Sequence, residues 1–392
     1  MNAIRPLLDI PQDELLAWLR SRDQPLLRAR QIRRWIVAGR VESFEQMSDL
    51  PRALREALAA EFVPLGTRIE RQQTAKDGTH KLLLRLEDDQ LVECVLIQEG
   101  DRRTACISTQ VGCGMGCVFC ASGLNGLIRN LTVAEIVEQL LRLRNLLPPY
   151  PTLSPREGEG RVPPYPLSPP GGEGLVRGER LTNIVVMGMG EPLANLDNLI
   201  AALDLAGAKD GLGIGARHVT VSTVGLPAKI RRLADLGRQY HLAVSLHAPN
   251  DALRTQIVPT NPKTGIADIL DSADYYFERN GRRVTFEYVL LQDVNDSIEQ
   301  ARELAGLLRG RCAHVNLIPF NDVEGLPYRQ PTQATVAAFV DILKQAGINV
   351  KIRKRKGSEI DAACGQLRRR VETQELAGVA RPESSKGVHG AT

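Results

Sequence analysis

The sequence lacks the features that would place it in a membrane or outside the cell. Among its 392 residues, no apolar run reaches the length of a membrane-spanning helix. The opening stretch, MNAIRPLLDIPQDELLAWLRSR, becomes acidic and polar too early for a signal peptide. The net charge of +4 is weak, so it allows a nucleic-acid partner without requiring one. We therefore expect a cytoplasmic protein that does not bind membranes.

The sequence also lacks the cysteine pattern of a disulfide-stabilised protein or of a common zinc site. Its seven cysteines, in a reducing compartment, favour metal binding or redox chemistry. Cys113, Cys117 and Cys120 form C-x3-C-x2-C, and Cys106 stands apart. A structural zinc site usually has two C-x2-C pairs, so zinc would need Cys106 or a distant cysteine. A [4Fe–4S] cluster on three thiolates leaves one iron open, and the spacing favours it over zinc.

Apolar periodicity predicts the order of helices and strands. Residues 11–20, residues 26–38 and the stretch SDLPRALREALAAEF have helical spacing, whereas KLLLRLEDDQLVECVLI predicts two strands around a polar turn. From Thr104 onward, amphipathic helices alternate with short apolar strands: TACIST, TNIVVMG, HVTVST, HLAVSLH, VTFEYVLL and HVNLIPF. This alternation predicts an α/β fold with a parallel sheet. Six units suggest a partial (β/α)6 barrel, and a doubly wound sheet remains the alternative.

These patterns divide the chain into parts with different expected roles. We predict a small N-terminal helical domain (1–75), a β-hairpin connection (76–104), a barrel (105–370) and a disordered tail (371–392). Residues 148–180 are dense in Pro, Gly, Glu and Arg and repeat themselves, which predicts a disordered insertion. The insertion follows a helix and precedes a strand, so in a barrel it should lie on the face opposite the active site.

The cysteine motif and five later segments resemble one known family. C-x3-C-x2-C directly after the first strand of a barrel is similar to the radical S-adenosylmethionine (SAM) superfamily. In that superfamily the open iron binds SAM, and an electron splits SAM to give a 5′-deoxyadenosyl radical. Together with the segment from Cys106 to Gln139, the stretches VVMGMGEPLANLDNL, HVTVSTVGL, LAVSLHAPND, NLIPFN and EIDAACGQL resemble the RlmN/Cfr family of RNA adenosine methyltransferases. The resemblance runs from about residue 5 to about residue 370.

The resemblance implies an activity, cofactors and partners. It implies methylation of adenine C2 in 23S rRNA at the peptidyl-transferase centre, and in tRNA beside the anticodon. It also implies that the N-terminal helical domain (1–75) is an accessory domain that binds RNA. The cofactors would be a [4Fe–4S] cluster and two molecules of SAM per turnover, with a flavodoxin-type reducing electron donor. The motifs are shared with Cfr-like enzymes that methylate adenine C8, so that reaction stays an alternative. A non-catalytic, zinc-stabilised RNA-binding protein is the alternative from another class.

The resemblance also implies roles for single residues. Cys364 in DAACGQL would carry the methyl group, and Cys106 would resolve the RNA adduct by forming a transient disulfide with it. Glu93 would accept the C2 proton, although the residues alone favour a solvent-facing glutamate on an alternating strand. Cys94 and Cys312 have no implied role. SAM contacts are implied at or after the ends of predicted strands, for Gly190, Glu191, Ser222, Ser245, Leu246, His247 and Asn321.

Overall fold

The computed structural model describes residues 4–148, 180–321, 325–353 and 368. The predicted tail and Cys364 lie outside the described residues, as does the predicted insertion apart from its end residues Pro148 and Arg180. Within the described part of the chain, no helix is both long enough and apolar enough to span a membrane.

The N-terminal lobe is built from three short helices, as predicted. They are α1 (Gln12–Arg20), α2 (Leu27–Val37) and α3 (Arg52–Glu61). Each buries two leucines or isoleucines four residues apart, which is one face of a helix. Proline precedes the first residue of both α1 and α3, where its missing N–H costs no hydrogen bond. Short pieces complete the lobe: β1 (Arg5–Pro6), η1 (Leu7–Asp9), η2 (Phe44–Gln46) and β2 (Phe62–Val63).

A ten-stranded mixed sheet forms the rest of the framework. Its order is β14-β13-β12-β11-β10-β9-β6-β5-β4-β3, with the strands from β14 to β6 parallel and β5, β4 and β3 antiparallel. The parallel strands are β6 (Arg102–Cys106), β9 (Asn183–Val186), β10 (Val219–Thr223), β11 (His241–Ser245), β12 (Val284–Leu290), β13 (Ala313–Pro319) and β14 (Asn349–Ile352). Since β6 and β9 to β13 are the six predicted strands, the predicted fold class is confirmed.

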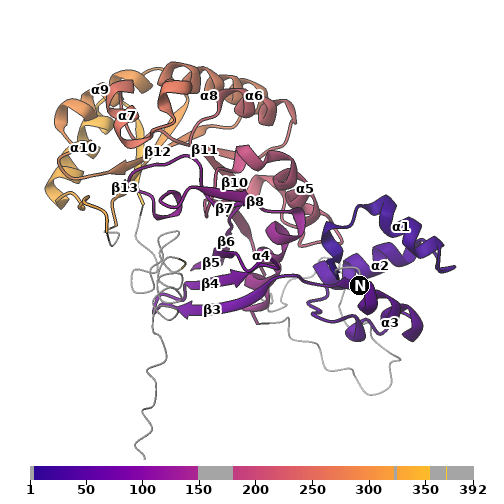
Figure 1. Ribbon diagram of the computed structural model, residues 1–392. Helices are drawn as coiled ribbons and strands as arrows, with labels where there is room; N and C mark the ends of the chain where they lie inside the picture. The colour runs from indigo at the N-terminus through magenta and orange to yellow at the C-terminus, as the bar shows by residue number, and fades with distance from the viewer. Residues whose placement is uncertain (1–3, 149–179, 322–324, 354–367, 369–392) are drawn as a thin grey trace, which may run out of the picture.

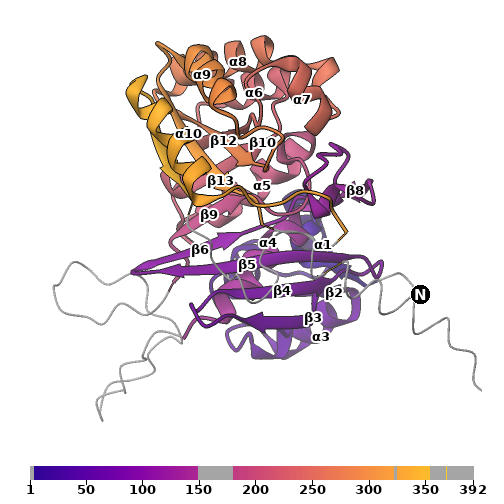
Figure 2. The same ribbon diagram turned by 90° about the vertical axis from the view of Figure 1, so that its left-hand side faces the viewer.

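Helices cover the outer side of the parallel strands (Figure 1). In chain order they are α4 (Val133–Asn145), α5 (Leu196–Gly207), α6 (Pro227–Asp235), α7 (Asp251–Ile257), α8 (Ile266–Asn280), α9 (Ile298–Leu308) and α10 (Gln333–Gln345). The antiparallel strands β3 (Arg68–Thr74), β4 (His80–Arg85) and β5 (Leu91–Glu99) lie side by side with β6 (Figure 2). Strands β4 and β5 were predicted and β3 was not. The domain boundaries themselves stay predictions.

Helix α4 joins the N-terminal lobe to the sheet. Its residues from Ala134 to Arg144 are buried with the exception of Glu135. At its first turn, the Ala134 amide donates to Asp9 in η1 (2.8 Å). One turn further, both oxygens of Glu138 accept amide hydrogens just before β3, from Gly66 (2.9 Å) and Thr67 (2.7 Å). Polar groups of a buried helix are thereby paired across element boundaries, as burial requires.

Candidate active site

The three motif cysteines lie in a loop between two short antiparallel strands. We call residues 113–126 the cluster loop; it connects β7 (Gln110–Gly112) to β8 (Leu127–Asn130). Its two ends meet where the Cys113 amide donates to the Gly126 carbonyl (2.9 Å). Gly112 has φ +79°, and a Cβ there would stand 2.1 Å from that carbonyl oxygen. Glycine is therefore required for the loop to close.

The three thiols are half-buried and close to one another. Burial raises the pKa of the Cys113 thiol to about 12. Burial also raises the pKa of Cys117, and the neighbouring Cys120 and Cys113 raise it further. Close, poorly hydrated thiols of this kind favour a positively charged metal group that takes them as thiolates.

The loop offers three thiols, which is the number that a [4Fe–4S] cluster with one open iron takes. In the described part of the chain, no three His, Cys, Asp or Glu side chains converge as one metal ion would require. A [4Fe–4S] cluster binds each thiolate on a different iron, so its three ligands stand further apart. Just beyond Cys120, the buried Ser122 hydroxyl has no hydrogen-bond partner among the described residues. An unsatisfied buried polar group beside the thiols is consistent with a group bound there.

The turn after β9 contacts both β7, the strand that leads into the cluster loop, and Val224, which follows β10. Gly190 has φ +101°, and a Cβ there would stand 2.5 Å from the Cβ of Gln110 in β7. The buried Glu191 carboxylate accepts amide hydrogens from Leu193 (3.0 Å) and Val224 (2.7 Å). Burial raises the pKa of Glu191. A ligand's amino group would therefore add a partner to a carboxylate that already holds two amides.

The turn after β11 packs directly on the cluster loop. His247 has φ +60°, and its Nδ1 accepts from the Val289 amide (3.1 Å). Burial, and then the charge of Arg254, lower its pKa to about 3, so the ring is neutral. The Phe119 ring of the cluster loop meets it edge-on, with centroids 4.8 Å apart. The turn that carries Ser245, Leu246 and His247 therefore contacts the cluster loop through His247, and the role of these residues as SAM contacts stays a prediction.

The remaining predicted SAM contacts lie at the same edge of the sheet. Ser222 is the next-to-last residue of β10 and pairs with Ala243 of β11. Asn321 lies two residues beyond Pro319, the last residue of β13. Both are half-buried. The carboxyl ends of β9, β10, β11 and β13 therefore surround the cluster loop with the residues predicted for the cofactor.

A second group of predicted residues lies on one face of the antiparallel strands. Cys106, the last residue of β6, stands opposite Val95 of β5. Glu93 is two residues from Val95, so it points to the same face as Cys106. Glu93 is buried, and its Oε2 pairs with Nζ of the equally buried Lys81 (2.8 Å). A solvent-facing Glu93 is therefore wrong, and Lys81, on the neighbouring strand β4, gave no sequence signal.

The C-terminal part of the chain also reaches this face. The amide of Arg368 donates to Glu93 Oε1 at 2.7 Å. Arg368 follows Cys364 by four residues in the sequence. Cys364 itself lies outside the described residues, so its predicted meeting with Cys106 stays a prediction.

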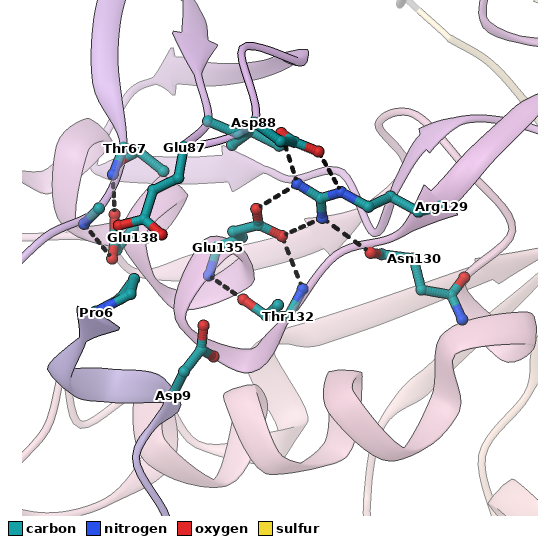
Figure 3. A pocket seen from close by; sticks show the side chains of 12 residues that line it. Pro6, Asp9, Thr67, Glu87, Asp88, Arg129, Asn130, Thr132, Glu135 and Glu138 are labelled. Atoms are coloured by element: carbon teal, nitrogen blue, oxygen red, sulfur yellow. Dashed lines mark hydrogen bonds and ion pairs between the residues drawn. The ribbon is translucent and has the colours of Figure 1, made fainter. Parts of the chain in front are cut away.

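A cavity of about 360 Å³ lies away from these residues, between the N-terminal lobe, the β4–β5 turn and α4 (Figure 3). Its lining is acidic, and Arg129 of β8 crosses it between two carboxylates. Arg129 is bidentate to Asp88 (2.7 and 2.9 Å) and to Glu135 (2.8 and 2.7 Å). Arg129 follows the cluster loop by three residues, so this clamp fixes the loop's second strand. Sequence reasoning missed it.

The arginines of α2 do not form one basic face. Arg33 Nη2 donates to the Ile10 carbonyl inside the lobe (2.9 Å). Arg30 pairs with Asp210 at the surface (3.0 Å), whereas Arg34 is exposed. The sequence also has a basic run at residues 351–357, and residues 354–357 of this run lie outside the described residues.

Comparison with known proteins agrees over most of the chain. The profile of the ribosomal RNA large subunit methyltransferase N-terminal domain matches residues 6–63, and that of the radical SAM superfamily matches residues 173–305. A relative from Rhodopirellula baltica, named a probable dual-specificity RNA methyltransferase RlmN, is 52% identical over 93% of this chain and 90% of its own. One from Clostridium perfringens with the same name is 41% identical over 93% and 97%.

A solved structure agrees as well. The crystal structure of a radical SAM methyltransferase from Sphaerobacter thermophilus superposes with a TM-score of 0.81 at 40% identity. The match covers 92% of this chain and 98% of that one.

Proposed function

This chain belongs to the RlmN family of radical SAM RNA methyltransferases, and we propose that its reaction is the methylation of adenine C2. It is an enzyme that methylates RNA using SAM and a [4Fe–4S] cluster, which excludes the non-catalytic zinc alternative. The proposed substrates are one adenosine of 23S rRNA at the peptidyl-transferase centre and a tRNA adenosine next to the anticodon. The observation that carries the proposal is that Glu93 and Cys106 share one buried face of the sheet.

Two sets of residues would hold the cofactors. Cys113, Cys117 and Cys120 would bind the cluster. When bound, the cluster supplies the electron that cleaves SAM to a 5′-deoxyadenosyl radical. The strand-end residues would hold SAM by its amino, carboxylate and adenosyl groups: Gly190, Glu191, Ser222, Ser245, Leu246, His247 and Asn321. Their position at the carboxyl ends of parallel strands supports this assignment.

Three side chains would complete the methyl transfer. Cys364 would carry the methyl group as a thioether, and loss of one hydrogen atom from it to the 5′-deoxyadenosyl radical would leave a carbon radical that bonds to adenine C2. Glu93 then accepts the C2 proton. The Cys106 thiolate would attack the Cys364 sulfur, so that the disulfide forms as the sulfur–carbon bond breaks. The released carbon would take up a proton, and the one surplus electron would pass to the oxidised cluster. The Lys81 ammonium and the Arg368 amide support this role because they fix both oxygens of the Glu93 carboxylate.

Nucleoside mass spectrometry tests the reaction. RNA from cells lacking the protein should contain no 2-methyladenosine at the target sites, and the wild-type gene should restore it. Cys364→Ala should restore none, and Cys106→Ala should leave RNA covalently attached to the protein. Cys312→Ala, at an exposed cysteine, is the matched control and should behave as wild type. Finding 8-methyladenosine without 2-methyladenosine would establish the Cfr-like reaction instead.

A further inference from the structure

Arg254 in α7 is fully buried, and none of its side-chain hydrogen bonds among the described residues goes to a carboxylate. Its guanidinium donates to the Leu246 carbonyl (3.1 Å), the Ser245 carbonyl (3.1 Å) and the Val224 carbonyl (2.5 Å). Its fourth partner is the Asn261 side-chain oxygen (2.6 Å). All four acceptors are neutral.

Neutral acceptors solvate a buried cation but do not cancel its charge. Burying an uncompensated charge costs several kcal/mol, so a nearby anion is expected. The acid on the same helix, Asp251, acts on Arg254 from a distance but does not bind it, because Asp251 Oδ1 accepts from the Asn261 amide group (2.9 Å) and from the Ile266 amide (2.8 Å). Burial lowers the pKa of Arg254 to about 10, and the charges of the nearby Cys117 and of Asp251 act against this effect.

The cluster loop is docked on the same helix. The Val118 amide donates to the carbonyl of Ile257, the last residue of α7 (3.1 Å). Cys117, Val118 and Phe119 pack with Ile257 in one apolar cluster. Two of the carbonyls that Arg254 binds, those of Ser245 and Leu246, belong to the end of β11 and the turn that follows it. The third, that of Val224, directly follows β10. Arg254 therefore joins this turn, which we call the SAM turn, to helix α7, on which the cluster loop is docked.

We propose that Arg254 is the counter-charge of the iron–sulfur cluster and a positioning residue for the SAM turn. The proposal rests on the proposed function through its requirement for a cluster on Cys113, Cys117 and Cys120. Three thiolates on an oxidised [4Fe–4S] core carry one net negative charge, and uptake of one electron from a reductant makes it two. A buried cation stabilises the reduced state more than the oxidised state, so Arg254 raises the reduction potential.

Anaerobic redox titration of the reconstituted full-length protein tests the charge directly. Arg254→Gln removes the positive charge and keeps a hydrogen-bond donor. Arg254→Lys keeps the positive charge and loses the planar, forked set of N–H donors of the guanidinium. At a fixed solution potential, we expect Arg254→Gln to lower the ratio of reduced to oxidised cluster about tenfold, which is about 59 mV for one electron. Arg254→Lys should stay within about twofold of wild type. Arg142→Met, at a buried arginine of α4, is the control for destabilisation alone and should leave the potential unchanged.

Each outcome decides for or against the proposal. Equal potentials in wild type and Arg254→Gln overturn it, as does a cluster lost from both Arg254 variants, because the fork rather than the charge would then matter. A cluster retained by Arg254→Lys and lost by Arg254→Gln supports it. Wild-type protein without iron and sulfide contradicts the proposed function itself. If Arg254→Gln shifts the reduction potential as expected but the wild-type protein does not methylate RNA, only the proposed function is contradicted.

Discussion

Removal of the Arg129 side chain should loosen the cluster loop. In the substitution Arg129→Met, β8 loses its bidentate links to the β4–β5 turn and to the first turn of α4 (Figure 3). Glu135 then keeps its capping contact with the Thr132 amide (2.9 Å) but has no cation beside it. The two carboxylates are not equivalent, because the Glu135 side chain is 13% exposed and that of Asp88 is 44% exposed.

These exposures set the expected magnitude. A hydrogen bond to a charged group contributes about 1.5–3 kcal/mol when it is shielded from water. The shielded Glu135 pair should therefore contribute about 2 kcal/mol, whereas the exposed Asp88 pair should contribute about 0.5–1 kcal/mol. We expect Arg129→Met to lower the free energy of unfolding by about 3 kcal/mol. Arg129→Lys should lose about half of that, since lysine lacks the planar fork.

Two measurements check this prediction. Urea unfolding followed by circular dichroism gives the change in free energy. The rate at which a chelator removes iron from reconstituted protein reports on the cluster loop and should rise in Arg129→Met. Arg232→Met is the matched control, because Arg232 pairs with Asp197 at an exposed site and should change both quantities little. The clamp has no role in the loop if Arg129→Met and the control unfold and lose iron alike.

Three further outcomes are expected. Lys81→Met leaves the buried Glu93 carboxylate without its cation and should lower the free energy of unfolding, measured with urea, by about 3–5 kcal/mol. The double variant Lys81→Met, Glu93→Leu should recover most of this loss, and no recovery would contradict the pairing. Burial raises the pKa of Glu138 from 4.5 to about 7, so its contribution to stability is full below pH 4.5 and is lost as the pH rises to 7. In Glu138→Gln the free energy of unfolding should change less with pH across that window, and the same pH dependence as in the wild type would contradict this reasoning. Deletion of residues 149–179 should leave RNA methylation unchanged. The reason is that the Thr182 amide, three residues beyond this segment, donates to the Arg103 carbonyl near the start of β6, at the opposite end of the strands from the site. A deletion variant that folds but does not methylate RNA would refute this placement.

The elements that the sequence predicts are those whose own residues carry the pattern. Helices α1 to α3 show it in their buried apolar positions four residues apart, and the six parallel strands show it as short apolar runs. Strand β3 was missed because its residues, RIERQQT, are nearly all exposed. It is a strand through its pairing with β4, which a local pattern does not contain.

The same distinction applies to the site. The cysteine spacing and the strand-end motifs are local, so the resemblance could find them. The burial of Glu93 depends on Lys81, which lies on the neighbouring strand and reads as an ordinary surface lysine. Arg254 likewise reads as a charged residue of a short helix, and only the fold brings three carbonyls around it.

Helix α4 has a consequence for how the protein is made. Its buried polar groups are satisfied by residues that precede it: Glu138 by Gly66 and Thr67, Gln139 by Ser108, and Arg142 by Glu42. As the chain leaves the ribosome, these hydrogen bonds can all form before any residue beyond Asn145 has emerged. These polar side chains of α4 are then satisfied, whereas β6 still waits to pair with β9. An insertion directly after α4 therefore separates a helix whose polar contacts are already made from the strand that continues the sheet.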